Sequence, residues 1–313
     1  MLKRSGFDLD TAVFLAEASA AAYSEAGARA FAKENGFSQI ELFDRGNVQG
    51  YWCGANDSAL LVFRGTNNIG QWLRDFQALP APHEWGWVHL GFSRGVDAVA
   101  RDLRPFDESA GKAGRHIWIA GHSLGGALAV LAAARLRVKN ICAPLVLTYG
   151  QPAVGLADFA SRFDAELSRS LWHVVNQNDV VPRVPPLYSH CGVVKRIIRP
   201  GALEAVAEND GAAQLERPVV PPSTFGRSET LQEIIGVTMP ATLETATPER
   251  VEISDIGPSS LSNFEFARLQ VALGTGESAG MEGVFLEGAM PFFKDHHIGA
   301  YIRLLKDIRD SRA

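Results

Sequence analysis

Short apolar runs alternate with segments of helical periodicity through most of residues 59–198. Most of the runs are nearly continuous in apolar residues, which is typical of strands buried on both faces of a sheet. The expected strands span residues 59–65, 116–121, 144–150, 171–176 and 193–198. Apolar residues at helical spacing occupy the segments between them, in residues 94–103, 124–137 and 156–167. This alternation predicts an α/β fold with a mostly parallel, doubly wound sheet and helices on both faces.

The N-terminal residues are expected to form a helix rather than a signal peptide. Residues 11–23 are largely apolar, but Glu17 interrupts them and Asp8 and Asp10 precede them. The apolar core of a signal peptide lacks such charges. We therefore expect a helix with Asp10 as its N-cap. No run approaches the roughly 18 apolar residues that a membrane span requires, so the expected location is the cytoplasm, with secretion by a non-classical route as the alternative.

Composition narrows the classes of partner. The chain has 313 residues and a net charge of −5, whereas nucleic-acid binding needs a basic face, so we expect no nucleic-acid partner. The three cysteines, Cys53, Cys142 and Cys191, are too few and odd in number for a disulfide framework. His190 and Cys191 are adjacent but lack the further ligands at the spacing of a zinc site, so no metal is expected there.

The composition changes after Arg199. Residues 201–280 contain twelve acidic residues against four arginines and no lysine. Residues 228–236 and 259–274 have amphipathic helical patterns that begin with serine. We expect one domain over residues 1–313, in which residues 201–290 form an acidic insertion or cap-like segment. A flexible excursion is the alternative interpretation.

The residues Gly-His-Ser-Leu-Gly at positions 121–125 fit the G-x-S-x-G pattern of a nucleophile elbow. They lie between an expected strand and an expected Ala/Leu-rich helix, which is the context that the pattern requires. Glycines on either side permit a sharp turn that holds the serine in a strained conformation. The helix N-terminus then offers N–H groups to an oxyanion. Ser123 is therefore the candidate nucleophile.

A serine nucleophile needs a base and an orienting carboxylate, and around such an elbow the chain order is serine, acid, histidine. Asp179 follows the expected strand at 171–176, in a loop rich in proline. Asp158 is the competitor, but it precedes a helix and is better explained as a helix-start residue. Asp179 is therefore the candidate acid.

Eight histidines compete for the role of base. The histidines that precede Ser123 break the expected order. His122 is adjacent to Ser123 on a sharp turn, so its side chain should point elsewhere. His173 lies in a strand, and His190 precedes the last expected strand of the sheet, so both are expected to be structural. The remaining candidates are His296 and His297, which precede a helical segment after all of these strands.

Five motifs occur in order along the chain: "FRGT", "HLGF", "GHSLGGALA", "TYGQPAVG" and "NQNDVVPRVPP". With them the chain resembles the class 3 lipase family over residues 59–192 and again over residues 295–305. The resemblance implies an α/β-hydrolase fold, no metal or organic cofactor, and hydrolysis of acylglycerols or related carboxylic esters. The stretch between His190 and His296 is much longer than in compact members of that family.

The resemblance assigns roles residue by residue. Ser123 matches the family nucleophile and Asp179 the family acid. His296 matches the family histidine, because a histidine five residues before a tyrosine, here Tyr301, often marks it; His297 is the fallback.

The resemblance also implies an oxyanion hole and a lid. Thr66 in "FRGT" matches an oxyanion-hole residue, and its N–H would act with the N–H of Leu124. Residues 67–80 align with the family's lid, whose apolar side chains would suit a lipid surface. The lid residues are Trp72, Leu73, Phe76 and Leu79.

The predicted function is hydrolysis of acylglycerol esters through a Ser-Asp-His triad and an acyl-enzyme, as in triacylglycerol lipases. A carboxylesterase, a phospholipase A1 or a feruloyl esterase would use the same triad. Two alternatives of other classes remain: a non-catalytic interaction module on a hydrolase scaffold, and a membrane-surface binding protein that depends on the apolar lid. The expected partner is a lipid or other ester, and the oligomeric state is left open.

Overall fold

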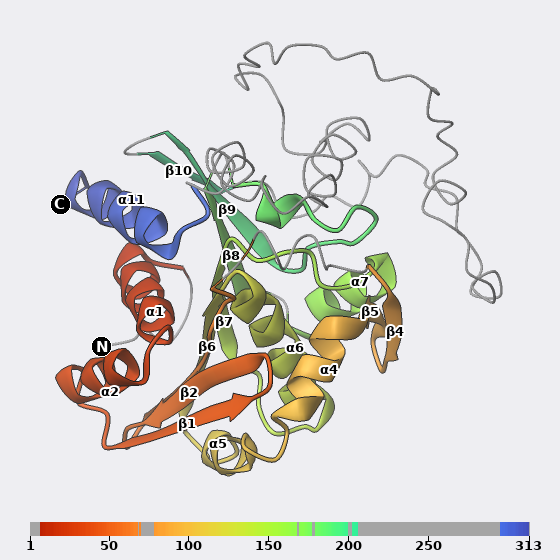
Figure 1. The fold of residues 1–313 in the computed structure, drawn as a ribbon, viewed down its shortest axis with the longest axis horizontal. Coiled ribbons are helices and arrows are strands. Elements are labelled where there is room, and N and C mark those ends of the chain that lie inside the picture. Colours follow the sequence, from red (N-terminus) through yellow and green to blue (C-terminus); the bar gives the residue numbers. More distant parts are fainter. Residues whose placement is uncertain are drawn as a thin grey trace, which may run out of the picture. The chain divides into compact units, whose positions relative to one another are not determined.

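The computed structural model is built around an eight-stranded mixed sheet, in the order β1-β2-β3-β6-β7-β8-β9-β10 (Figure 1). It describes residues 7–67, 69, 78–167, 169–176, 179–199, 202–205 and 295–312. The strands β3, β6, β7, β8 and β9 pair in parallel, and antiparallel strands flank them on both sides. The strands of this sheet are β1 (Gln39–Arg45), β2 (Val48–Gly54), β3 (Ser58–Phe63), β6 (His116–His122), β7 (Leu145–Tyr149), β8 (Leu171–Asn176), β9 (Val193–Arg199) and β10 (Ala202–Ala205). The five expected strands correspond to the five parallel ones, so the mostly parallel sheet is confirmed.

Alternate side chains of the central strands enter two separate hydrophobic layers. In β3, Leu60 and Val62 face one layer, whereas Leu61 and Phe63 face the other. Helices α1, α2 and α11 cover the first layer, and α4, α5, α6 and α7 cover the second, on the opposite face of the sheet (Figure 1). The helices are α1 (Leu9–Ala21), α2 (Glu25–Glu34), α4 (Leu90–Ala98), α5 (Arg104–Ala110), α6 (Leu124–Val138), α7 (Ala157–Glu166) and α11 (Ile298–Asp310). Helices on both faces of the sheet are therefore confirmed.

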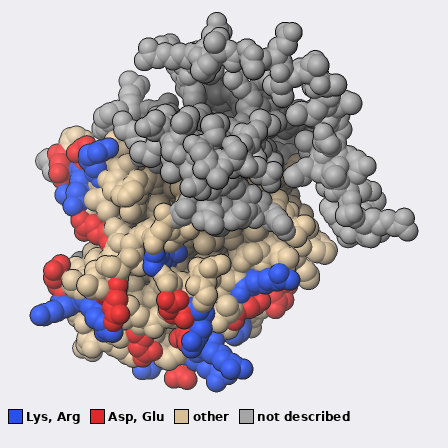
Figure 2. Space-filling model, in the orientation of Figure 1, with Lys and Arg blue, Asp and Glu red and all other residues tan. Residues whose placement is uncertain are grey.

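Smaller elements lie outside the main sheet. The strands β4 (Pro80–His83) and β5 (Gly86–His89) form a separate two-stranded sheet, and η1 (Val181–Arg183) is a single 3₁₀ turn. No helix in the described ranges is both long and apolar enough to cross a bilayer. Acidic and basic side chains are interspersed over the described residues on the face shown in Figure 2.

The N-terminal helix begins earlier than predicted. Asp8, not Asp10, is the N-cap: its backbone is extended and its Oδ1 accepts a hydrogen bond from the Thr11 N–H at 3.0 Å. Asp10 already lies in the first turn of α1, where the positive end of the helix dipole stabilises a carboxylate. The prediction that Asp10 caps the helix was wrong, because either aspartate could do so and only the backbone conformation decides.

The helix expected at residues 94–103 is displaced toward the N-terminus. Helix α4 ends at Ala98, and a new helix, α5, begins at Arg104 with Pro105 in its first turn. Proline is favoured there because its missing N–H would have no intrahelical partner. Val99 and Leu103 lie in the turn between the two helices and are fully buried, so their apolar character reflects burial rather than helix.

Most of the predicted acidic insertion at residues 201–290 lies outside the described residues. The two helices expected within it, at residues 228–236 and 259–274, also lie outside the described residues. The described part is β10, which pairs antiparallel with β9. The insertion and the single-domain organisation therefore stay predictions.

The carboxyl ends of the parallel strands meet at one edge of the sheet. There the chain leaves β3 toward Gly65, β6 toward Ser123, β7 toward Gly150 and β8 toward Asp179. In open α/β sheets this is the edge at which ligands bind. The topology alone thus brings segments that are far apart in sequence to a common place.

A mostly buried ion pair ties α6 to α5. Two nitrogens of the Arg135 guanidinium donate to the two carboxylate oxygens of Asp107 at 2.8 and 2.6 Å. The side chains are 12% and 14% exposed. The pair anchors the helix that begins directly after Ser123.

We predict that Asp107→Asn lowers the free energy of unfolding by about 2–4 kcal/mol, because it leaves a mostly buried guanidinium without its carboxylate. The matched control is Asp102→Asn, which breaks the pair between Asp102 and Arg45, whose side chains are 22% and 60% exposed. That change should cost less than about 1 kcal/mol. Urea denaturation measures both, and equal losses in the two variants would contradict the prediction.

Candidate active site

Ser123 occupies the tight turn between β6 and α6. Its backbone has φ 57° and ψ −130°, a conformation that is strained for a residue other than glycine. A Cβ atom at Gly121 would overlap the carbonyl of Gly125, and one at Gly125 would overlap the carbonyl of Phe63. Only glycine fits at either position. The packing on both sides therefore holds the serine in the strained turn that an elbow needs.

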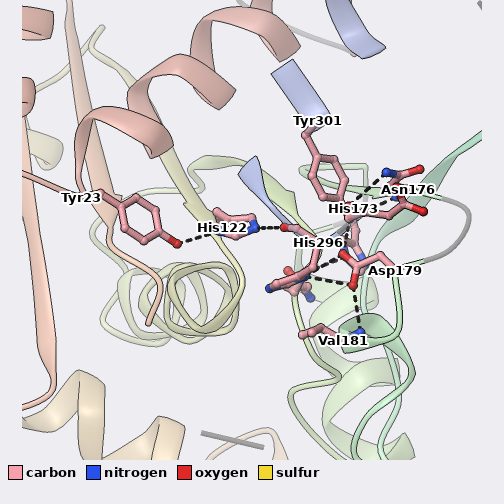
Figure 3. Close-up of polar contacts among 10 residues, drawn as sticks. Tyr23, His122, His173, Asn176, Asp179, Val181, His296 and Tyr301 are labelled. Carbon is pink, nitrogen blue, oxygen red and sulfur yellow. Dashed lines mark hydrogen bonds and ion pairs between the residues drawn. The ribbon is translucent and has the colours of Figure 1, made fainter. Parts of the chain in front are cut away.

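A carboxylate–imidazole pair lies just beyond the end of β8. His296 Nδ1 is 2.9 Å from Asp179 Oδ1 and 2.8 Å from Oδ2 (Figure 3). Because a carboxylate can only accept, the proton of this contact is on Nδ1, and the neutral ring has its lone pair on Nε2. The carboxylate of Asp179 is fully buried and also accepts from the Val181 N–H at 2.9 Å and from the Tyr301 hydroxyl. The imidazole is thus held in the tautomer that a general base requires.

Gly150 and Tyr301 enclose this pair. Gly150 has φ 56°, and a Cβ on it would lie 2.5 Å from Asp179 Oδ2, 2.9 Å from the Tyr301 hydroxyl and 3.0 Å from His296 Nδ1. Any side chain there would push into the pair. Burial, and then the nearby Asp179, raises the pKa of Tyr301 well above its usual value, so its hydroxyl stays protonated and donates to the carboxylate. The same hydroxyl oxygen accepts from the Asn176 N–H at 3.1 Å.

Sequence reasoning assigned neither Gly150 nor Tyr301 to this contact. Gly150 stands in the motif "TYGQPAVG", directly after an apolar strand. A glycine at the carboxyl end of a parallel strand is the signal that could have indicated a close approach. Tyr301 served only to identify His296, and nothing in its spacing indicates that it binds Asp179.

Two buried atoms at the centre of the site lack hydrogen-bond partners within the described ranges: Ser123 Oγ and His296 Nε2. Their residues are 1% and 4% exposed. Buried polar atoms are rarely unpaired, and these two are the hydroxyl and the lone pair that acyl transfer would use. The structure brings Asp179 and His296 into contact but shows no hydrogen bond between Ser123 and His296. Such bonds are often long without substrate and shorten when it binds.

The second histidine of the pair has a different place. His297 is exposed and is the N-cap of α11, where its Nδ1 accepts from the Gly299 N–H at 3.1 Å. His296 is buried against Asp179. Of the two candidates, only His296 lies at the carboxylate.

The other downstream histidines make structural contacts. His173 Nε2 accepts from the backbone N–H of Gln151 at 3.1 Å, and His190 Nε2 donates to the Pro182 carbonyl at 2.7 Å. Burial lowers the pKa of both histidines. They therefore brace the loops that follow β7 and Asp179. The described part of the chain contains no group of three His, Cys, Asp or Glu side chains that could hold a metal ion.

The expected oxyanion-hole residues lie beside the elbow. Leu124 is the first residue of α6, so its N–H is at the positive end of the helix. Thr66 follows β3, next to Gly65. A Cβ on Gly65 would lie 3.3 Å from Ser123 Cβ and 2.7 Å from the His122 carbonyl, so the loop after β3 packs directly on the turn.

His122 connects the elbow to both ends of the chain. Its Nδ1 is 2.8 Å from the Tyr23 hydroxyl, and its Nε2 is 2.6 Å from the His296 carbonyl oxygen (Figure 3). The rings of His122 and His296 have centroids 4.7 Å apart. Burial, and then the neighbouring His296, lowers the pKa of His122 well below its usual value, so the ring is neutral. The sequence indicated only that the His122 side chain points elsewhere from the turn and is not the base.

Of the predicted lid, the structure describes only residues 67, 69 and 78–80. Three of its four residues lie outside the described residues: Trp72, Leu73 and Phe76. Leu79 is 50% exposed, and the other exposed large apolar side chain in the described ranges is Leu187, at 58%. Leu187 has φ 76°, a strained conformation for leucine. The Tyr188 hydroxyl donates to the Ala78 carbonyl at 3.3 Å, so the two loops that carry these leucines lie against each other.

Two curated proteins illustrate the sequence likeness. Secreted mono- and diacylglycerol lipase 1 of Fusarium solani is 33% identical over 138 residues, which cover 42% of this chain and 41% of that protein. The chloroplastic phospholipase A1-Igamma2 of Arabidopsis thaliana is 41% identical over 100 residues, which cover 29% of this chain and 18% of that protein. The chain therefore spans less than half the length of these two relatives.

Solved structures and a family model agree with this likeness. Lipase II from Rhizopus niveus superimposes with a TM-score of 0.59 at 24% identity, covering 64% of this chain and 84% of that one. The sheet with helices on both faces is thus the α/β-hydrolase fold of that lipase. Residues 60–189 match the family model described as Lipase (class 3). The likeness to the class 3 lipase family therefore rests on these residues, which make up less than half of the chain.

Proposed function

We propose that the protein is a serine hydrolase that cleaves the carboxylic ester bonds of acylglycerols. The observation that carries the proposal is the buried contact between Asp179 and His296 beside the strained turn of Ser123. The match of residues 60–189 to the class 3 lipase family supports the same chemistry.

In the proposed first step, His296 Nε2 takes the proton of Ser123 Oγ as that oxygen attacks the ester carbonyl carbon. The resulting imidazolium is stabilised by Asp179, which accepts from Nδ1 throughout. Nε2–H then donates its proton to the leaving alcohol oxygen, and the acyl group stays on Ser123. In the second step water attacks the acyl-enzyme with His296 again as base. Nε2–H then returns the proton to Ser123 Oγ as its bond to the acyl carbon breaks, which releases the carboxylic acid and restores the free hydroxyl.

The negative charge on the tetrahedral intermediate needs donors in fixed positions. The N–H groups of Leu124 and Thr66 are the candidates, because Leu124 begins α6 and the loop that carries Thr66 packs on the elbow. One such donor contributes about 10²–10³ in rate in other serine hydrolases. The close packing of these backbones means that little reorganisation is needed during the reaction.

The relatives of the chain and the apolar side chains exposed on it both favour acylglycerols as substrates. The Fusarium relative is a mono- and diacylglycerol lipase. Leu79 and Leu187, exposed on adjoining loops, would contact a lipid surface. A second candidate is phospholipase A1 activity, which the likeness to the Arabidopsis enzyme favours. Both use the same three side chains and differ in the head group that they accept.

The triad assignment predicts a sharp difference between neighbouring histidines. Ser123→Ala and His296→Ala should each lower kcat for p-nitrophenyl butyrate by about 10⁴ or more, because they remove the nucleophile or the base. His297→Ala is the matched control; it removes only a helix cap and should keep kcat within about threefold while lowering stability by about 1 kcal/mol. Steady-state kinetics and thermal melting measure these effects. Full activity in Ser123→Ala, or equal losses in the two histidine variants, would refute the assignment.

The substrate class is tested on emulsions. Dioleoylglycerol and triolein should be hydrolysed faster than phosphatidylcholine presented at the same surface area, as titration of released fatty acid will show. Leu187→Ser should slow hydrolysis of these emulsions but leave hydrolysis of soluble p-nitrophenyl acetate unchanged, because only the lipid surface contacts an exposed leucine. Faster release from phosphatidylcholine would instead support the phospholipase alternative.

A further inference from the structure

Tyr23 lies between α1 and α2, yet its hydroxyl reaches the elbow. The hydroxyl oxygen is 2.8 Å from His122 Nδ1, and a Cβ on Gly65 would overlap that same oxygen. Tyr23 therefore contacts both the strand that ends in the elbow and the loop that carries Thr66. Figure 3 shows Tyr23, His122 and His296 following one another across the site.

Tyr23, His122 and the His296 carbonyl form a hydrogen-bond series, and the carbonyl determines the direction of both bonds. The His296 carbonyl can only accept, so His122 Nε2 carries the proton and donates to it. The neutral ring of His122 then has its lone pair on Nδ1, which accepts from the Tyr23 hydroxyl. Burial raises the pKa of Tyr23 far above its usual value, so this hydroxyl stays a donor.

This series holds His296 at a second point. Asp179 binds the ring through Nδ1, whereas His122 binds the backbone carbonyl of the same residue and lies against the ring face. With the Asp179 contact alone, the ring could still pivot about that hydrogen bond. With both contacts, the position of Nε2 relative to the turn of Ser123 is fixed.

We propose that Tyr23 and His122 are positioning residues for the esterase reaction: they hold the His296 backbone so that Nε2 meets the Ser123 hydroxyl. The inference rests on the proposed function. It also explains why a second imidazole beside the base does not compete for the proton. The only lone pair of His122 already accepts from Tyr23, and its other nitrogen already donates to His296.

The first test is Tyr23→Phe, which removes the hydroxyl and keeps the ring. We expect kcat for p-nitrophenyl butyrate to fall about tenfold or more with KM within about twofold, because a displaced base affects the transition state more than substrate binding. Tyr51→Phe is the matched control, since the buried Tyr51 hydroxyl donates to the Ala18 carbonyl of α1 at 3.0 Å, outside this series. It should keep kcat within about twofold.

A kcat in Tyr23→Phe within twofold of the wild type would overturn the proposal. An equal loss of kcat in Tyr51→Phe would also overturn it, because the effect would then come from loosening α1. Thermal melting of both variants checks that the compared proteins are folded.

The second test separates the two contacts of His122. In His122→Gln the side-chain amide can reach the place of Nε2 and donate to the His296 carbonyl, whereas in His122→Asn it reaches only the place of Nδ1, near Tyr23. We expect His122→Gln to keep at least about fivefold more kcat than His122→Asn. The reverse order would contradict the proposal.

A readout independent of turnover separates this inference from the proposed function. If the wild-type protein showed no ester hydrolysis that is lost in Ser123→Ala, the proposed function would be refuted. In the ¹⁵N spectrum of the wild-type protein, His122 should show a protonated Nε2 and an unprotonated Nδ1, and the Nδ1 signal should shift in Tyr23→Phe. A proton on His122 Nδ1 would refute the hydrogen-bond series whatever the activity.

Discussion

A fully buried carboxylate organises the centre of this fold. Asp179 lies beyond the end of β8 with no exposed surface, and an unpaired carboxylate there would be strongly destabilising. Its donors come from its own loop, through the Val181 N–H, and from the C-terminal segment, through His296 and Tyr301. Because no other described segment supplies these donors, satisfying Asp179 requires α11 to dock on the sheet. The same contacts that satisfy the carboxylate orient the imidazole, so stability and the geometry of the site are coupled.

Much of the fold could be predicted from sequence because buried parallel strands have a simple pattern. The runs that became β3, β6, β7 and β8 place apolar side chains in both hydrophobic layers, which explains their nearly continuous apolar pattern. The hairpin of β1 and β2 was not predicted: β1 mixes polar and apolar residues, and its Gly46-Asn47 turn was the available signal. The helix at residues 94–103 was misplaced because Val99 and Leu103 are buried in a turn.

The site was only partly predictable, for a physical reason. Ser123 and Asp179 each follow a strand, so local context indicates them, and the order of residues narrows the base to two histidines. The choice between His296 and His297, and the contacts of Tyr23 and His122, depend on side chains from segments about a hundred or more positions apart. No periodicity or motif encodes such contacts. They exist because the parallel sheet brings the ends of its strands to one edge, and because α1 and α11, from the two ends of the chain, pack on one face of that sheet.

The central claim is that Ser123 carries the acyl group between two half-reactions. The most direct measurement is peptide mass spectrometry of the wild-type protein quenched during turnover of p-nitrophenyl butyrate. The account predicts a butyryl group on the peptide that contains Ser123, disappearing once the substrate is consumed. Turnover with the butyryl group on a different residue, or with p-nitrophenol released in a burst and Ser123 unmodified, would contradict it.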